Sequence, residues 1–383
     1  MTRALAALPK AHLHLHFTGA MRNATLVELA AERGLQLPEA LTRSWPPRLS
    51  AADERGWFRF QRLYDIARSV IRQPGHVHRL LREAAEDERA EGSGWLEIQV
   101  DPSGYAARLG GLTPVVELVL DAARAAAAAT GVGIGVIIAS NRTKHPLEAR
   151  TLARLAAQYT GQGVIGFGLS NDERRGTASD FAPAFRIAAR SGLLSVPHGG
   201  ELLGPASVRA CLDELHADRI GHGIAAARDR DLTKRLAGGG VTLEVCPTSN
   251  VALGIAAEPA DVPLTELLNN GVPVALGADD PLLFGQRLTA QYEIAREVHG
   301  LADAQIAELA RMSVRGSAAP AATASLLLAG IDDWLATPPK TAPDERHTAA
   351  YPPATSAMSY SDSMVRFGRK KALPLSIPVM PTE

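Results

Sequence analysis

The chain has 383 residues, of which 46% are hydrophobic and 21% charged, and its formal net charge is -1. A sequence of this length and composition can bury a large core, whereas its balanced charge gives no electrostatic case for binding nucleic acid or an anionic membrane. Cys211 and Cys246 are too few for a disulfide framework. The sequence also shows no signal peptide and no apolar run of membrane-spanning length, so we expect a soluble, cytoplasmic protein.

Short apolar segments typical of strands alternate with amphipathic helical stretches along most of the chain. The expected strands cover residues 11–17, 95–100, 133–140, 164–170, 193–198, 219–222, 241–246 and 274–280. Regular alternation of strand and helix with short loops implies parallel pairing and right-handed crossovers. Eight such repeats predict an α/β fold, the closed (β/α)8 TIM barrel, rather than an open sheet.

Two stretches do not fit the repeat. Residues 22–75 are too long for one strand-to-helix connection and carry aromatic residues at helical spacing, Phe60 and Tyr64 among them. We predict a helical insertion there, which either packs on the barrel or covers the site as a lid. Beyond residue 330 the sequence is rich in proline, serine, threonine and alanine. We therefore expect a barrel over residues 1–330 and a disordered tail over residues 331–383.

The first expected strand carries His14 and His16 at alternate positions. Side chains two apart on a strand share a face, so this pair forms half of a metal site. Polar residues also follow three later strands: His198, His222 and the pair Asp279 and Asp280. Active residues of (β/α)8 enzymes lie at the carboxyl ends of strands. Three histidines and an aspartate there would suit Zn²⁺ or a similar divalent ion.

These residues belong to six short motifs. The motifs are KAHLHLH at 10–16, GFGLSNDE at 166–173, HGGE at 198–201, RIGHG at 219–223, EVCPTSN at 244–250 and DDP at 279–281. Together they resemble the adenosine deaminase family of the amidohydrolase superfamily, over roughly residues 8–317. The combination is specific for the family but less so for the substrate, because adenosine, adenine and modified-nucleoside deaminases share most of it.

The resemblance implies a role for each matching position. The residues that it assigns to one bound Zn²⁺ are His14, His16, His198 and Asp279. It assigns His222 to orienting and deprotonating the attacking water, Glu201 to protonating the purine ring at N1, and Asp280 to a hydrogen bond with N7. A metal that activates water and a carboxylic acid whose pKa is raised enough to hold a proton suit this reaction.

The sequence departs from the family pattern where the family binds the sugar. Thr18 replaces an acidic residue that binds the ribose 5′-hydroxyl, and Gly168 and Asn171 replace an aspartate and a glycine. We expect Thr18, Gly168 and the backbone N–H of Asn171, which would face N3, to contact substrate, together with Phe60 and Tyr64 of the insertion. His12 replaces a glutamate, and we assign it to packing or to support of the ligands.

Hydrolytic deamination of adenosine or 2′-deoxyadenosine at C6, with release of ammonia, is the leading hypothesis. A modified adenine nucleoside of the 6-aminodeoxyfutalosine type comes second, and free adenine third. Amide or phosphoester hydrolysis is disfavoured because the acidic pair at the purine N1 and N7 positions has no use there. A non-catalytic metal-binding relative would lack Glu201, His222 or a ligand, and none is missing. The expected partner is therefore a small purine, while the oligomeric state stays open.

Overall fold

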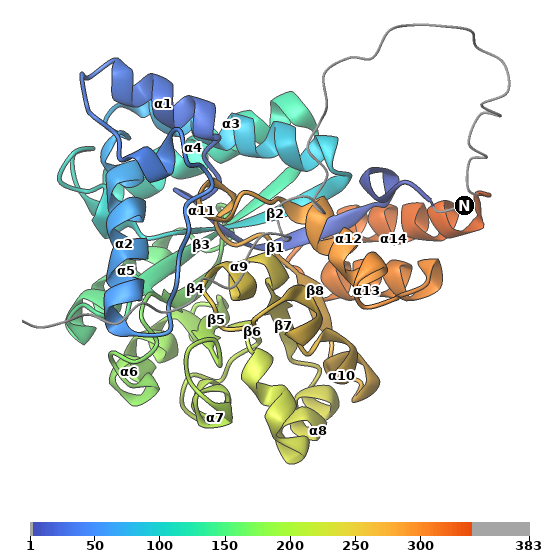
Figure 1. Ribbon diagram of the computed structural model, residues 1–383. Coiled ribbons are helices and arrows are strands. Elements are labelled where there is room, and N and C mark those ends of the chain that lie inside the picture. Colours follow the sequence, from blue (N-terminus) through green and yellow to red (C-terminus); the bar gives the residue numbers. More distant parts are fainter. Residues whose placement is uncertain (1–2, 339–383) are drawn as a thin grey trace, which may run out of the picture. The chain divides into compact units, whose positions relative to one another are not determined.

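The computed structural model describes residues 3–338 and contains one parallel sheet of eight strands in the order β1 to β8 (Figure 1). The strands are β1 (Lys10–His16), β2 (Ser93–Val100), β3 (Gly133–Asn141), β4 (Val164–Ser170), β5 (Leu194–Gly199), β6 (Arg219–His222), β7 (Thr242–Val245) and β8 (Val274–Leu276). The predicted (β/α)8 barrel is confirmed. The last strand ends earlier than the predicted residue 280, and Asp279 has a left-handed backbone that extended structure excludes.

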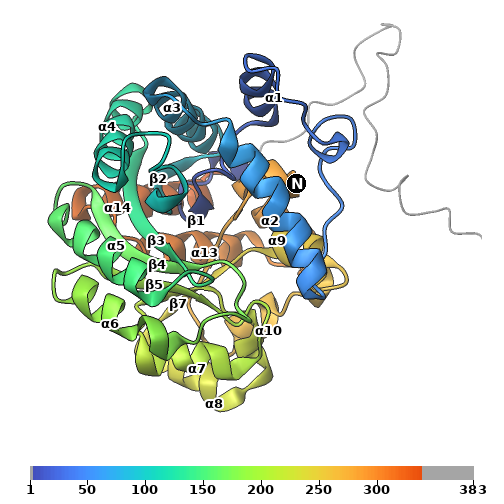
Figure 2. The same cartoon turned by 90° about the vertical axis from the view of Figure 1, so that its left-hand side faces the viewer.

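Helices surround the strands, as Figure 2 shows in a view turned by 90°. Helix α3 (Pro74–Ala90) precedes β2. The helices that follow β2 to β7 are α4 (Leu112–Thr130), α5 (Pro146–Gln158), α6 (Ala178–Ala189), α7 (Pro205–Glu214), α8 (Arg230–Gly239), α9 (Pro247–Ala252) and α10 (Leu264–Asn269). After β8 come α11 (Pro281–Phe284), α12 (Leu288–Glu297), α13 (Asp303–Arg315) and α14 (Ala321–Ala336). Short 3₁₀ turns are η1 (Leu5–Ala7), η2 (Glu39–Leu41), η3 (Pro102–Gly104), η4 (Ile224–Arg228) and η5 (Pro259–Asp261). None of the helices within residues 3–338 is both long and apolar enough to cross a membrane.

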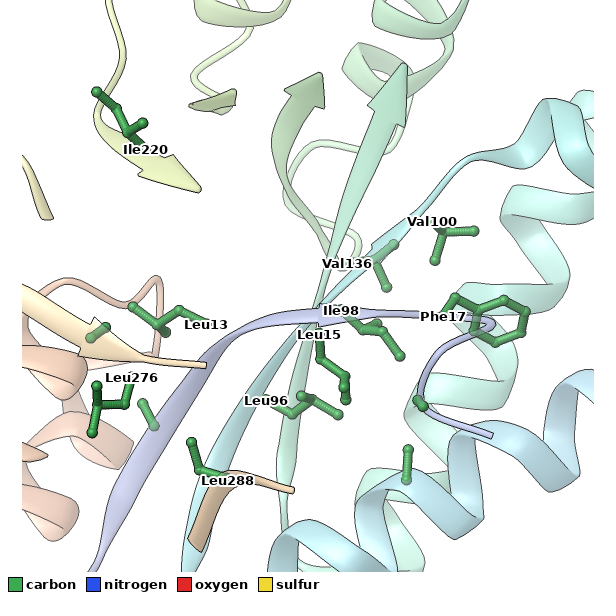
Figure 3. Packing of buried hydrophobic residues seen from close by; sticks show 14 of the residues in the cluster. Leu13, Leu15, Phe17, Leu96, Ile98, Val100, Val136, Ile220, Leu276 and Leu288 are labelled. Carbon is green, nitrogen blue, oxygen red and sulfur yellow. The ribbon is translucent and has the colours of Figure 1, made fainter. Parts of the chain in front are cut away.

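The strands divide their side chains between two environments. Leu13 and Leu15 of β1 and Leu96 and Ile98 of β2 are fully buried and lie on the side of the strands that faces the helices (Figure 3). Because side chains alternate along a strand, the intervening residues such as His14 point into the barrel. Packing of the leucines against helices therefore fixes which residues face the interior.

The barrel closes between β8 and β1 through a single parallel bridge, which joins Leu15 and Asp279. The His16 backbone N–H donates to the Asp279 carbonyl at 3.0 Å, and the Asp279 N–H donates to the His14 carbonyl at 3.0 Å. Three residues predicted as metal ligands thus contribute their backbone to the last seam of the barrel.

His12 also holds β1 and the end of β8 together at this seam. Its Nε2 accepts a hydrogen bond from the Ala278 backbone N–H at 3.0 Å, and its Nδ1 lies 2.7 Å from the Glu88 carboxylate. Because Nε2 accepts, Nδ1 carries the proton and donates to Glu88. His12 is fully buried and links β1, α3 and the end of β8.

The stretch from residue 22 to residue 75 contains α1 (Asn23–Ala31) and α2 (Glu54–Ser69), which join β1 to α3. Asp53 caps α2, since its carboxylate accepts from the Gly56 backbone N–H at 2.7 Å. Figure 2 shows α2 passing in front of the strands. The predicted insertion is therefore helical, and α2 lies over the end of the barrel where the site is expected.

The folded part of the chain extends past the boundary that we expected at residue 330. Helix α14 continues to Ala336 and buries Ile331 and Trp334. The Trp334 indole donates to the Ala4 carbonyl at 3.0 Å, and the Arg3 guanidinium donates to the Leu335 carbonyl at 2.7 Å. The boundary predicted from the proline-rich composition lies too early, because these tertiary contacts hold residues 331–336 in the folded part of the chain. The rest of the expected tail, residues 339–383, lies outside the described residues.

Two truncations separate the helix from the tail. A chain ending at residue 330 loses the buried Ile331 and Trp334, and we expect its free energy of unfolding to fall by at least about 3 kcal/mol. A chain ending at residue 338 keeps these contacts and should stay within about 0.5 kcal/mol of the full chain. Denaturant midpoints of the three proteins check this. Equal midpoints for the two truncated chains would contradict a stabilising role for the end of α14.

Candidate active site

The four predicted metal ligands converge at the carboxyl ends of β1, β5 and β8. The His16 Nε2 lies 3.2 Å from the His198 Nε2 and 3.3 Å from the Asp279 Oδ1. The His14 Nε2 lies 3.7 Å from the same Asp279 oxygen. Two ligand atoms of a tetrahedral zinc site, each about 2.0–2.1 Å from the ion, are about 3.3–3.4 Å apart. The separations therefore fit one divalent ion shared by these side chains.

The surroundings of His14 keep its Nε2 free for such an ion. The buried Nε2 has no hydrogen-bond partner within residues 3–338, whereas Nδ1 lies 2.7 Å from the Glu244 carboxylate. A carboxylate on one ring nitrogen fixes the imidazole's orientation and leaves the other nitrogen available as a ligand. Arg219 donates to Glu244 at 2.8 Å and also to Glu97. Both carboxylates are fully buried, so Arg219 balances two charges inside the barrel.

Asp279 is oriented by a neighbour from α9. The Ser249 hydroxyl donates to the Asp279 Oδ2 at 2.6 Å, which leaves Oδ1 facing the imidazoles. A serine in the EVCPTSN motif thus supports the ligand set, a role that the sequence alone did not reveal. Cys246, from the same motif, is buried with its pKa raised well above the usual value, chiefly by burial, so it remains a thiol.

Glu201 and His222 lie side by side in the pocket beside the ligands. The His222 Nε2 is 3.6 Å from the Glu201 Oε1, and both side chains are almost completely buried. Burial raises the pKa of Glu201 well above its usual value, and the charges of Asp279 and Glu173 raise it further. Burial lowers the pKa of His222 to about 3, so its imidazole is neutral. A protonated carboxyl group can donate a proton, and a neutral imidazole has an unprotonated ring nitrogen that can accept a hydrogen bond or a proton.

Glu173 holds the loop that carries Glu201. Its carboxylate accepts from the backbone N–H groups of Gly200 at 2.5 Å, Glu201 at 3.0 Å, Leu202 at 2.6 Å and Leu203 at 2.9 Å. Hydrogen bonds from four backbone N–H groups to the Glu173 carboxylate are charge-assisted and therefore strong. The sequence motif contains Glu173, but its role becomes visible only when the loop after β5 is seen folded around it.

Backbone strain is concentrated at the site. The non-glycine residues with positive φ within residues 3–338 are Asn171 at 80°, His222 at 62°, Asp279 at 61° and His216 at 49°. Asn171 directly follows β4, His222 is the last residue of β6, and Asp279 lies in the turn after β8. Such conformations cost free energy and persist where the surroundings impose them, which is common at active sites. Asp280, which follows Asp279, lines the pocket.

Helix α2 forms the outer wall of the pocket. The residues that it contributes are Trp57, Phe60, Gln61, Tyr64 and Arg68. The Trp57 indole donates to the Asn171 Oδ1 at 3.3 Å, and the Asn171 Nδ2 donates to the Gln61 Oε1 at 2.8 Å. Asn171 therefore ties α2 to the end of β4. The insertion is both packed on the barrel and placed over the site, so the two expectations for it are compatible.

Thr18 lies behind the pocket wall rather than in it. Its side chain is fully buried, and its hydroxyl makes a hydrogen bond with the Tyr105 hydroxyl. Tyr64 and Tyr105 line the pocket, whereas Thr18 and Gly168 are not among the lining residues. An effect of Thr18 on substrate would therefore pass through its pocket-lining neighbours Tyr105 and Tyr64. Sequence reasoning missed Tyr105, because a tyrosine in a loop after a strand carries no motif signal.

The fold and the site together define a class before any relative is considered. An eight-stranded parallel barrel that gathers histidine and aspartate side chains at the carboxyl ends of its strands belongs to the (β/α)8 class, and it has a candidate metal site at the end where enzymes of that fold carry their active residues.

Comparisons with known proteins narrow this class. The profile of the adenosine deaminase family matches residues 9–334. A Streptomyces virginiae relative that carries the name adenosine/adenine deaminase is 65% identical over 333 residues, which cover 87% of this chain and 98% of the relative. An adenine deaminase from Sinorhizobium fredii is 36% identical, over 85% of this chain and 99% of the relative. The crystal structure of adenine deaminase from Arthrobacter aurescens matches with a TM-score of 0.78 at 30% identity and covers 86% of this chain and 100% of that one. The chain belongs to the adenosine deaminase family, which makes it a deaminase-type hydrolase.

The burial of Arg219 between two carboxylates leads to a prediction about the free energy of unfolding. Arg219→Met leaves the Glu97 and Glu244 carboxylates buried without their cation, so the free energy of unfolding should fall by about 3–5 kcal/mol. The matched control is Arg235→Met, which removes an exposed pair with Asp213 and should cost at most about 1 kcal/mol. Chemical denaturation of both variants measures the difference. Equal losses would show that the buried network adds nothing beyond a surface ion pair.

Proposed function

We propose that the protein deaminates the adenine ring at C6 by hydrolysis, with a divalent ion bound by His14, His16, His198 and Asp279. The observation that carries this proposal is the close approach of the His16 Nε2 to the His198 Nε2 and to the Asp279 Oδ1, with the His14 Nε2 beside the same Asp279 oxygen, at a covered pocket. Family membership supports the reaction type.

The donor set of three imidazoles and one carboxylate suits Zn²⁺. Such an ion, when bound, supplies a nucleophilic water at neutral pH. His222 then orients this water toward C6 and accepts its proton, a role that suits a neutral imidazole in the pocket wall. The Glu244 carboxylate holds the His14 imidazole in place.

Glu201 supplies the proton that the ring needs. Attack of water on C6 increases the electron density on N1, and a carboxyl group held near N1 can protonate it. Glu201 suits this role because its buried carboxyl group lies beside His222 and Glu173 fixes its loop. Asp280 donates to N7 as a carboxylic acid: burial raises its pKa well above the usual value, and its buried Oδ1 has no hydrogen-bond partner within the described part of the chain. The backbone N–H of Asn171 faces N3.

Adenosine or 2′-deoxyadenosine is the first candidate substrate, and a modified nucleoside of the 6-aminodeoxyfutalosine type is an alternative. Free adenine is a second candidate that one observation favours. Thr18 is fully buried outside the pocket lining, with its hydroxyl hydrogen-bonded to Tyr105, so it is not placed to bind a ribose 5′-hydroxyl directly. Without that partner, a nucleoside gains less over the bare base in this pocket.

Ammonia release from a substrate panel tests the proposed function. The panel contains adenosine, 2′-deoxyadenosine, 6-aminodeoxyfutalosine and adenine, and we expect turnover of at least one compound to its 6-oxo product. Dialysis against a chelator should abolish turnover, and Zn²⁺ should restore it. No ammonia from any panel member, or full turnover by metal-free protein, would refute the proposal.

Glu201→Gln tests the proton-transfer role. The amide keeps the size of the side chain but cannot pass a proton, so kcat should fall by at least about 100-fold while bound Zn²⁺ per chain stays unchanged. Glu308→Gln is the control, because Glu308 pairs only with surface arginines among the described residues. Steady-state kinetics and elemental analysis give the two readouts. Loss of metal from Glu201→Gln would instead reassign the residue to supporting the metal site.

A further inference from the structure

Gln99 is a polar residue of β2 that the mechanism above does not use. Glu97, two residues earlier, reaches Arg219 of β6 through the barrel interior. Because side chains two apart on a strand share a face, Gln99 also points inward, one layer nearer the carboxyl end. It pairs in register with His16 of β1 and lines the same pocket. Its carboxamide therefore faces the place where substrate is proposed to bind.

The Gln99 carboxamide is buried without a partner. The side chain is 2% exposed, and neither Oε1 nor Nε2 makes a hydrogen bond with any residue in the range 3–338. Buried polar groups are almost always hydrogen-bonded, because leaving one unpaired costs its full desolvation free energy. The barrel interior thus keeps a destabilising group at the pocket wall, which is expected where a ligand completes the hydrogen bonds.

Gln291 of α12 is a buried carboxamide of the same residue type with a structural role. It is fully buried, its Oε1 accepts from the Thr248 backbone N–H and hydroxyl, both at 3.0 Å, and its Nε2 donates to the Arg287 carbonyl at 3.1 Å. Both ends of that amide are satisfied within the protein. Gln99 and Gln291 therefore form a matched pair with opposite hydrogen-bonding states.

Gly168 helps to keep the Gln99 amide uncovered. A Cβ atom at position 168 would lie 3.6 Å from the Gln99 Oε1, so a larger side chain would reach over the amide. The absence of a side chain at Gly168 of β4 therefore leaves this side of the Gln99 amide uncovered.

We propose that Gln99 is a substrate-binding residue, whose amide donates from Nε2 and accepts at Oε1. This inference rests on the proposed deaminase function and adds a contact that selects substrate. Its complement is a group that presents a donor and an acceptor side by side. The hydroxyl groups of a ribose present both a donor and an acceptor, and the N9–H of free adenine presents the donor. A ribose therefore pairs both amide atoms, whereas free adenine pairs the Oε1.

Gln99→Leu and Gln291→Leu, made in the full chain, test the assignment. Gln99→Leu removes the unpaired amide but keeps the bulk of the side chain, so the melting temperature should stay equal or rise. Its KM should increase about 10- to 100-fold with kcat changed less than about 3-fold, because the contact binds ground state and transition state alike. Gln291→Leu should lower the melting temperature, since it leaves Thr248 unpaired.

The substrate panel separates the two sources of the contact. A KM increase for adenine alone assigns Gln99 to the ring edge, and an increase for nucleosides alone assigns it to the ribose; both support the proposal. An unchanged KM for every compound that the wild type turns over overturns the role of Gln99 and leaves the deaminase function standing. A lower melting temperature for Gln99→Leu without a KM change also overturns it. A wild type inactive on the whole panel refutes the proposed function and this inference together.

Discussion

The closure of the barrel between β8 and β1 is the constraint on which the site depends. The backbone groups of His14, His16 and Asp279 form the hydrogen bonds of this seam, and the side chains of the same residues are three of the four proposed metal ligands. The ligand geometry is therefore a consequence of closure. A barrel that failed to bring Asp279 to β1 would lose its last backbone contacts and the site in one event, so folding and assembly of the site are coupled.

The parts of this arrangement that follow a local period could be predicted from the sequence. Alternation in β1 sends His14 and His16 inward and Leu13 and Leu15 toward the helices, because a strand has only two faces. Eight strand-like segments in regular alternation with helices leave few topologies. Once the topology is a barrel, residues at the carboxyl ends of distant strands must meet, which is why His198 and Asp279 could be placed beside β1.

Contacts across the interior could not be predicted, because they depend on distances that no local pattern encodes. Arg219 joins Glu97 from β2 to Glu244 from β7, and nothing in the sequence pairs these three positions. The contact between Tyr105 and Thr18 could not be predicted for the same reason. The end of the domain was misjudged because Trp334 is held by the N-terminal segment, more than three hundred residues away in the sequence.

The hydrogen bonds from Asn171 to α2 join two parts of the chain that make different contributions to the site. The proposed ligands and proton-transfer groups lie at the ends of barrel strands or in the turns just after them, whereas much of the pocket's outer wall comes from one helix inserted after β1. Replacing side chains on α2 would reshape that wall without moving a strand end. Such a layout makes the insertion a replaceable module: related barrels can keep one reaction and acquire new substrates by remodelling a single helix.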